Sequence, residues 1–301
     1  MKIDQLIYKG NKLSPKVQLN QIRNTILDPL GKKLTNYVNW IYLDGISETK
    51  SDLYPVTIIG EGPPVLLLHG FDSCFLEFRR LVPFLKNDYK LIIPDMFGFG
   101  FCPRPIGSEY GLNKILIHLD SLINQLSIDS EYGVIGASMG GGIALEFARK
   151  NTSKVNRLQL LSPAGLTGNP KPIYRPFDTL GVCILKQSFI RKKLCRQAFS
   201  DPDKNVGVQE EQIASIHLQV PGWGYSLSAF ARSGGVASCA KPSLNKPISV
   251  IWGEQDKILT KDLREESIKS LNCKHEKVNN CGHLPHLESP EYVAKCWIES
   301  K

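Results

Sequence analysis

Tyr132-Gly133-Val134-Ile135-Gly136-Ala137-Ser138-Met139-Gly140 is the stretch of this chain that decides its fold. The apolar residues 132–135 favour a buried strand, and a Gly-x-Ser-x-Gly sequence follows them directly. A tight strand-to-helix turn leaves no room for large residues beside its serine, which accounts for the glycines two positions before and after Ser138. Such a turn presents the hydroxyl next to the free N–H groups of a helix N-terminus. Ser138 is therefore predicted to be a nucleophile.

The residues on both sides of this turn alternate between strand patterns and helix patterns. Apolar residues continue as a helix pattern after the serine, and basic residues close it at Arg149 and Lys150. Short apolar runs predict strands at 56–59, 65–68, 91–93, 158–161, 248–252 and 275–278, and amphipathic runs predict helices at 76–85, at 112–126 and from 290. This alternation predicts an α/β fold with a mostly parallel sheet covered by helices on both faces.

The alternation of strands and helices is interrupted twice, which predicts three regions. Residues 165–241 contain several prolines among helical pieces and are expected to form a lid inserted between two strands. The core then comprises residues 51–164 and 242–301. Residues 1–50 form an extension with apolar residues at helical spacing on both sides of Pro29, the second group being Leu34, Tyr37, Val38 and Ile41. We expect this extension to dock on the core rather than on a membrane or a partner.

Composition sets the class of protein. The chain has 301 residues, a hydrophobic content of 42% and a net charge of +8, all ordinary for a globular protein with one α/β core and a lid. No apolar run has membrane-spanning length, and no signal-peptide core follows Met1. Eight cysteines are scattered without a Cys-x-x-Cys pair, which favours reduced thiols in a cytoplasmic protein. No basic stripe interleaved with aromatic residues indicates nucleic-acid binding. The oligomeric state is left open.

Part of the positive charge is concentrated in the expected lid, at Lys186, Arg191, Lys192, Lys193 and Arg196. A solvated helix face is the simpler interpretation. Attraction to an acidic substrate or peripheral contact with an anionic membrane surface is the alternative.

A serine nucleophile needs a base to remove its proton and a carboxylate to orient that base. Asp256 comes just after the predicted strand that ends at Trp252, and His283 lies in the loop after the last strand. Because such loops meet at the carboxyl ends of parallel strands, we expect these side chains to converge on Ser138. Glu254 is the rival carboxylate and His286 is the rival base.

Several motifs together resemble the α/β-hydrolase superfamily, in particular its lid-bearing esterases and C–C bond hydrolases. They are 68–71, 94–100, 136–140, 253–256 and 282–283, and the likeness runs from about Tyr54 to the C-terminus. The resemblance implies a catalytic triad of Ser138, Asp256 and His283, in that chain order. It also implies an oxyanion hole formed by the backbone N–H groups of Phe71 and Met139. It further favours Asp256 over Glu254 and His283 over His286.

Other polar residues receive weaker expectations. His69, Asp72 and Trp223 are candidates for substrate contact, although His69 is also expected to shape the oxyanion turn and Asp72 to have a structural turn role. His118 is expected on a helix surface and His217 in the lid. No cofactor is expected, because the glycine pattern at 98–103 lacks the third glycine of a dinucleotide loop. No metal is expected, because Cys281, His283 and His286 lack a second ligand pair.

The sequence thus predicts a serine esterase that acts on a small-molecule carboxylic ester, thioester or related acyl substrate. A C–C bond hydrolase or lyase and an acyltransferase are alternatives on the same triad. A menaquinone-pathway synthase of this superfamily is disfavoured, since it carries an arginine where this chain has Gly142. A non-catalytic ligand-binding protein on the same fold is the alternative outside enzymology.

Overall fold

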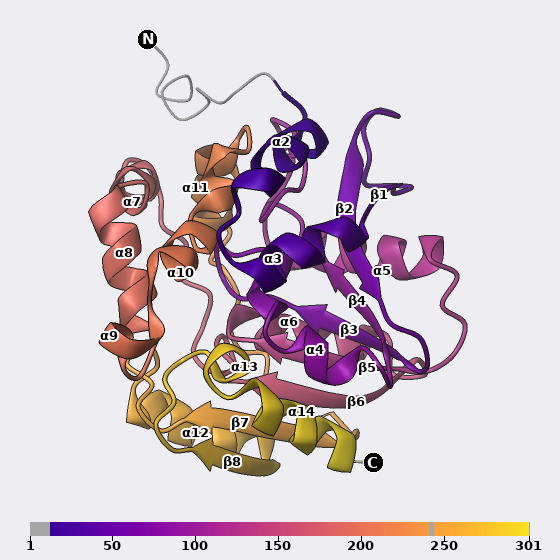
Figure 1. Ribbon diagram of the computed structural model, residues 1–301, viewed down its shortest axis with the longest axis vertical. Helices are drawn as coiled ribbons and strands as arrows, with labels where there is room; N and C mark the ends of the chain where they lie inside the picture. Colours follow the sequence, from indigo (N-terminus) through magenta and orange to yellow (C-terminus); the bar gives the residue numbers. More distant parts are fainter. Residues whose placement is uncertain (1–12, 241–243, 301) are drawn as a thin grey trace.

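The computed structural model describes residues 13–240 and 244–300. Its centre is an eight-stranded sheet in the order β1-β2-β4-β3-β5-β6-β7-β8 (Figure 1). Only the β1–β2 and β2–β4 pairs are antiparallel, so the predicted mostly parallel α/β fold is confirmed. The strands are β1 Val38–Tyr42, β2 Leu53–Ile59, β3 Pro64–Leu68, β4 Lys90–Pro94, β5 Tyr132–Ala137, β6 Val155–Leu161, β7 Ile248–Gly253 and β8 Lys274–Val278.

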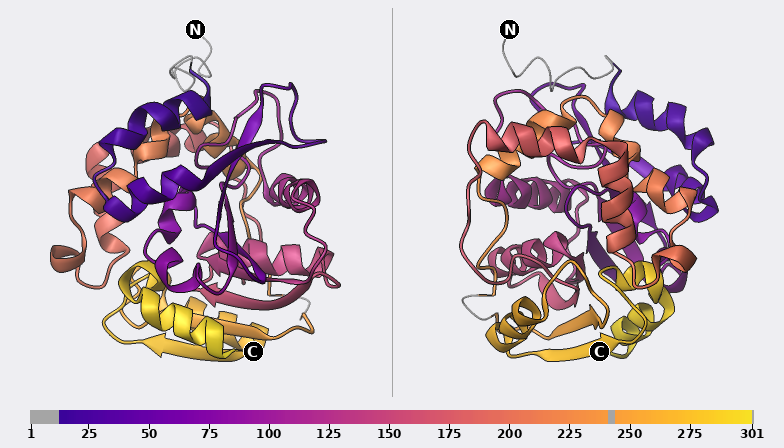
Figure 2. Two further views of the ribbon diagram at one scale, coloured as in Figure 1. Left: turned by 45° about the vertical axis from the view of Figure 1, so that its right-hand side comes forward. Right: turned by 90° about the vertical axis from the view of Figure 1, so that its left-hand side faces the viewer.

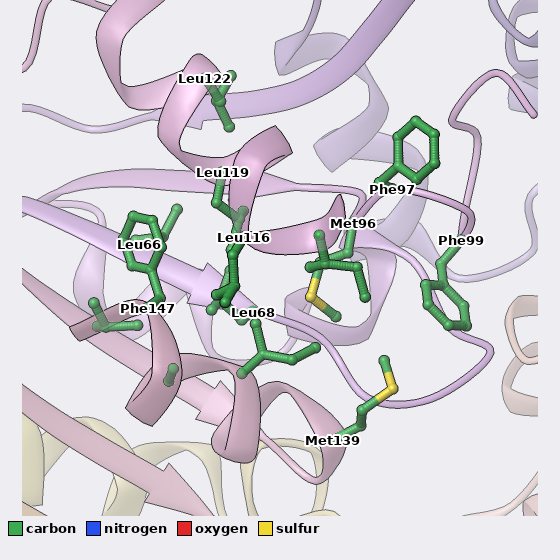
Figure 3. Packing of buried hydrophobic residues seen from close by; sticks show 14 of the residues in the cluster. Leu66, Leu68, Met96, Phe97, Phe99, Leu116, Leu119, Leu122, Met139 and Phe147 are labelled. Carbon is green, nitrogen blue, oxygen red and sulfur yellow. The ribbon is translucent and has the colours of Figure 1, made fainter. Parts of the chain in front are cut away.

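Helices cover both faces of the sheet because successive side chains of the buried strands point to opposite faces. Leu66 and Leu68 of β3 pack with residues of α5 (Leu112–Gln125) and α6 (Met139–Lys150), as Figure 3 shows. Val65 and Leu67 face the other way, toward α4 (Val82–Leu85) and α14 (Pro290–Glu299). The remaining C-terminal helices are α12 Lys261–Leu271 and α13 Pro285–Glu288.

The segment between β6 and β7 carries five helices that lie together on one side of the molecule (Figures 1 and 2). They are α7 Phe177–Leu185, α8 Ser188–Gln197, α9 Pro202–Asn205, α10 Val208–Ile213 and α11 Trp223–Arg232, with the 3-10 turn η4 Ile216–Gln219 before α11. We call this segment, residues 165–240, the lid. None of the described helices is both long and apolar enough to cross a bilayer.

The described part of the N-terminal extension packs on the rest of the molecule. It contains α2 Pro15–Ile22, η1 Arg23–Thr25, α3 Pro29–Leu34 and η2 Thr35–Tyr37. Asp28, which caps α3, forms a buried ion pair with Arg79 of the core at 2.7 Å. The Leu27 N–H donates to the Gln212 side chain of the lid at 2.9 Å. The extension therefore contacts both the core and the lid.

Two local expectations are wrong. Val38 and Ile41, expected to continue a helix, lie in β1, which pairs with β2. The sheet therefore begins before residue 51. The single helix expected over 76–85 is a 3-10 turn, η3 Phe75–Phe78, followed by the one-turn helix α4. Pro83, which has no N–H to donate, lies near the start of α4 and prevents the two pieces from forming one helix.

Candidate active site

Ser138 lies in a strained turn between β5 and α6. Its φ of 50° and ψ of −120° fall in a region that non-glycine residues rarely adopt. The flanking glycines make this turn possible. A Cβ at Gly136 would lie 2.4 Å from the Gly140 oxygen, and a Cβ at Gly140 would lie 2.1 Å from the Leu68 oxygen. The spacing of the glycines in the sequence therefore reflects close backbone approach on both sides of the serine.

Ser138, His283 and Asp256 form one hydrogen-bonded chain. The Ser138 Oγ lies 2.8 Å from His283 Nε2, and His283 Nδ1 lies 2.9 Å from Asp256 Oδ2. Asp256 lies in the loop that follows β7, and His283 lies in the loop between β8 and α13. The backbone N–H of His283 donates to the Ala198 oxygen of the lid at 2.7 Å. The structure thus brings together the three residues expected to converge.

The hydrogen bonds to Asp256 keep its carboxyl group ionised. Burial raises its pKa, but the bonds from His283 and from the N–H groups of Leu259 and Ile258 outweigh burial and lower the pKa below its ordinary value. An ionised Asp256 accepts the proton of His283 Nδ1–H. This leaves His283 Nε2 as the acceptor of the Ser138 hydroxyl, the arrangement in which histidine serves as a base.

The rival residues lie outside this chain. Glu254 is exposed. His286 is fully buried, with Nε2 3.1 Å from Glu77 Oε1 and its ring 5.3 Å from that of Phe78. His286 therefore packs against the buried Glu77 carboxylate, and no hydrogen bond joins it to Ser138.

The turn that contains Phe71 lies against the serine. A Cβ at Gly70 would be 3.4 Å from Ser138 Cβ. Among the described residues, the Phe71 N–H has no hydrogen-bond partner. Met139 is the first residue of α6, and the first N–H groups of a helix have no partner within it. Both N–H groups are available to an oxyanion beside Ser138.

His69 fixes the shape of this turn. Its Nε2 accepts the Met96 N–H at 3.0 Å, so its proton resides on Nδ1, which donates to the Gly70 oxygen at 2.8 Å. Burial lowers the pKa of His69, which keeps the ring neutral. His69 is fully buried and does not line the cavity next to Ser138.

Asp72, the residue after Phe71, connects the turn to the lid. Its buried carboxylate accepts hydrogen bonds from Arg191, from His217 Nε2 at 2.9 Å and from Trp223 Nε1 at 2.8 Å. Burial opposes ionisation, but His217, Arg191 and Trp223 lower the pKa of Asp72 to about 2. Asp72 does line the cavity, whereas Trp223 does not. Asp72 and Trp223, two of the three residues expected to contact substrate, thus bind one another.

Two expectations about polar residues are corrected here. Arg191 was grouped with solvated lid residues, yet it is buried and paired with Asp72. His118 was expected on a helix surface, but only 1% of it is exposed, because its ring packs 5.2 Å from Tyr54. Burial lowers the pKa of His118 to about 3.

A cavity of about 280 Å³ opens beside Ser138 and His283, between the core and the lid. Apolar side chains form most of its wall: Phe71, Leu185, Leu194, Ala198, Phe199, Ile213, Ala214, Ile258, Leu284 and Leu287. Arg79 and Arg191 also line it, and each is paired with a buried carboxylate. The site therefore combines an activated hydroxyl with a largely apolar binding space.

Sequence reasoning missed Glu77 and Glu210. Glu77 accepts the Gly70 N–H at 3.1 Å, and Glu210 of the lid contacts Arg79 and Arg80. An acidic residue inside the apolar run 75–78 is a signal that could have identified Glu77. No local signal marks Glu210. Among the described residues, no cluster of three or more His, Cys, Asp or Glu side chains is arranged to hold a metal ion.

Comparison with known proteins places this geometry in a family. Residues 63–198 match the model of the alpha/beta hydrolase fold. The chain is 36% identical over 258 residues to Lipase 1 of Psychrobacter immobilis, covering 77% of this chain and 75% of the relative. It is 28% identical over 256 residues to the alpha/beta hydrolase domain-containing protein VTE7 of Arabidopsis thaliana, covering 83% and 77%.

A solved structure has the same fold. The meta-cleavage product hydrolase from Pseudomonas fluorescens IP01 superimposes with a TM-score of 0.71 at 20% identity, covering 87% of this chain and 96% of that one. At this identity the likeness concerns the fold alone. The chain belongs to the α/β-hydrolase family.

Proposed function

We propose that this protein is a serine hydrolase that cleaves neutral carboxylic esters or thioesters through an acyl-enzyme on Ser138. The observation that carries the proposal is the hydrogen-bonded chain from Ser138 through His283 to Asp256, at the wall of an apolar cavity. A hydroxyl in this arrangement loses its proton to the histidine as it attacks a carbonyl carbon.

The reaction proceeds in two halves. His283 Nε2 takes the Ser138 proton while Oγ attacks the acyl carbon, and the N–H groups of Phe71 and Met139 hold the oxyanion. The tetrahedral intermediate collapses, His283 gives its proton to the leaving alcohol or thiol, and the acyl group stays on Ser138. Water then attacks the acyl-enzyme with His283 as base, and collapse releases the acid. Asp256 remains ionised and stabilises the imidazolium in both halves.

The charges of the cavity support a neutral acyl substrate. Arg79 is paired with Asp28 and Glu210, and Arg191 is paired with Asp72. Both arginines are thereby neutralised, so neither offers an unpaired charge to a substrate carboxylate. The apolar wall favours an acyl chain or a ring instead.

Hydrolysis of a series of p-nitrophenyl esters of increasing acyl length tests the proposal. We expect Ser138→Ala to lower kcat by at least about 10⁴-fold, because it removes the nucleophile. Ser73→Ala is the matched control, since Ser73 lines the same cavity but has no contact with His283. It should retain activity within about tenfold.

Equal losses in the two variants would contradict Ser138 as the nucleophile. An absence of turnover on every ester and thioester would contradict the proposed substrate class. It would favour C–C bond cleavage or acyl transfer, which the same three residues can serve, or a non-catalytic ligand-binding role.

A further inference from the structure

The outer side of the lid exposes an unusual concentration of apolar side chains. Seven of the twenty large apolar residues that are exposed in the described chain lie between positions 173 and 194. They are Ile173, Tyr174, Phe177, Leu180, Ile184, Phe189 and Leu194, with exposed fractions from 38% to 69%. We call the exposed side chains of residues 171–197 the lid face. Single exposed apolar residues are normal, but a contiguous group marks an interaction site.

The apolar residues of α7 form one stripe on the lid face. Phe177, Leu180 and Ile184 are spaced three and four positions apart, which places them on the same side of the helix. Asp178 and Val182 are the buried residues of α7, and Asp178 pairs with Arg232 of α11. The stripe therefore points away from the core. The right-hand view of Figure 2 shows α7 and α8 together on the side that faces the viewer.

The same surface is strongly basic. Residues 171–197 contain seven Lys and Arg against one Asp, so this short segment has a net charge of +6 in a chain of +8. The single acidic residue, Asp178, is buried. Lys192 and Arg196 pair with Glu211 and Asp203, whereas Lys186 and Lys193 are exposed and have no ion-pair partner among the described residues. An apolar stripe bordered by unpaired lysines complements an anionic apolar surface.

We propose that the lid face docks on an anionic lipid surface, with the apolar side chains of α7 and α8 in the headgroup region and the lysines against acidic headgroups. A second copy of the chain is a poor occupant, because a symmetric contact would place Lys186 and Lys193 of one face against the same lysines of the other. A lipid surface supplies both the apolar layer and the negative charge.

The lid face is continuous with the wall of the cavity. Leu185 and Leu194 belong to α7 and α8 and also line the cavity beside Ser138. A docked molecule would thus hold its cavity next to the lipid, from which an acyl ester of a lipid can enter. This choice of substrate source rests on the proposed function, whereas the docking itself does not.

Co-sedimentation with phosphatidylcholine vesicles that contain roughly one quarter phosphatidylserine tests the docking. We expect the full chain to bind them, and raising the salt from about 0.15 M to about 1 M should weaken binding because it screens the lysines. Lys186→Gln with Lys193→Gln should lower the partition coefficient about 30-fold, a loss of about fivefold for each charge. Phe177→Ser with Phe189→Ser should lower it at least tenfold, because both rings leave the interface. Neither pair lines the cavity, so hydrolysis of a water-soluble ester should remain unchanged.

Matched variants on other helices distinguish docking by the lid face from nonspecific adsorption to vesicles. Lys261→Gln with Lys269→Gln removes two charges from α12, and Leu263→Ser with Tyr292→Ser removes two exposed apolar side chains, one from α12 and one from α14. These controls should bind vesicles as the wild type does. Ser138→Ala should also bind normally even though its hydrolysis is lost, which separates failure of docking from failure of the proposed function.

Three outcomes would overturn the docking. One is an absence of vesicle binding by the wild type. Another is equal loss of binding in the lid-face variants and the controls. The third is self-association in sedimentation velocity that disappears with Phe177→Ser and Phe189→Ser, which would assign the face to a second copy.

Discussion

The residue that orients the proposed base is Asp256, and its replacement tests the assignment most directly. Asp256→Asn preserves the shape of the side chain but favours the tautomer in which His283 Nε2 carries the proton and cannot accept from Ser138. We expect kcat for ester hydrolysis to fall about 10⁴-fold with an unchanged circular dichroism spectrum. Glu254→Gln, an exposed neighbour, is the control and should retain full activity. Near-wild-type turnover in Asp256→Asn would refute the assignment.

At the scale of single residues, the sequence identified the groups that lie at strand ends. Ser138 follows β5, Asp256 follows β7 and His283 follows β8 by a short loop, and parallel strands bring these positions to one edge. It did not reveal that the Asp72 carboxylate is occupied by Trp223 and by other lid residues. Such pairs join positions more than a hundred residues apart, so no local pattern encodes them.

At the scale of elements, buried ion pairs attach the extension and the lid to the core. Arg79 contacts Asp28 of the extension and Glu210 of the lid, and all three side chains are nearly fully buried. Arg79→Met should lower the free energy of unfolding by about 3 kcal/mol, because it leaves the buried Asp28 charge without its ion-pair partner. Urea unfolding measures the change.

An exposed ion pair of the same chain serves as the control for the buried pair of Arg79. Arg196 pairs with Asp203 on the lid surface, where 89% of the aspartate side chain is exposed. Arg196→Met should cost less than about 1 kcal/mol, because solvent screens that pair. If both arginine variants lose the same stability, burial does not account for the effect of Arg79.

Helices and strands were predictable where the sequence pattern was long or strongly apolar. The helix α5 and the strands β3 to β7 follow directly from such patterns. Val38 and Ile41 illustrate the limit, since helical spacing and strand alternation cannot be distinguished over so few residues. Pairing with β2, a tertiary contact, decides in favour of the strand.

At the scale of the whole molecule, one short segment holds the regions together. Asp72 binds the lid, Glu77 contacts His286 near the C-terminus, and Arg79 binds the extension. All three lie within residues 72–79, which run from the turn that contains Phe71 to the residue after η3, so the proposed site and the tertiary attachments share the same backbone. Composition and motifs predicted the α/β core and a helical lid, but the role of this segment depends on contacts that only the folded chain brings together.

The charges of this segment predict a specific loss of stability in acid. Although burial acts in the opposite direction, their partners lower the pKa of Asp72 from 3.8 and that of Glu77 from 4.5, each to about 2. A carboxyl group whose pKa is lower in the folded state stabilises the fold above its unfolded pKa, and this contribution is lost as the pH falls toward the folded value. We expect the free energy of unfolding to fall between pH 4.5 and pH 2, by about 2 kcal/mol for Asp72 and about 3 kcal/mol for Glu77.

Asp95 has the opposite effect on the free energy of unfolding, but in a different pH range. Burial raises its pKa from 3.8 to about 7, despite hydrogen bonds from the Phe101 and Phe75 N–H groups, so its effect on stability falls between those two values. Below pH 3.8 Asp95 is protonated in both states, and the loss measured there belongs to groups such as Asp72 and Glu77. Urea unfolding at several pH values should therefore show a shallower slope in Asp72→Asn and Glu77→Gln. Asp129→Asn, whose side chain is 96% exposed, should retain the wild-type slope. Parallel slopes in all four proteins would show that the buried carboxylates do not anchor the fold through their charge.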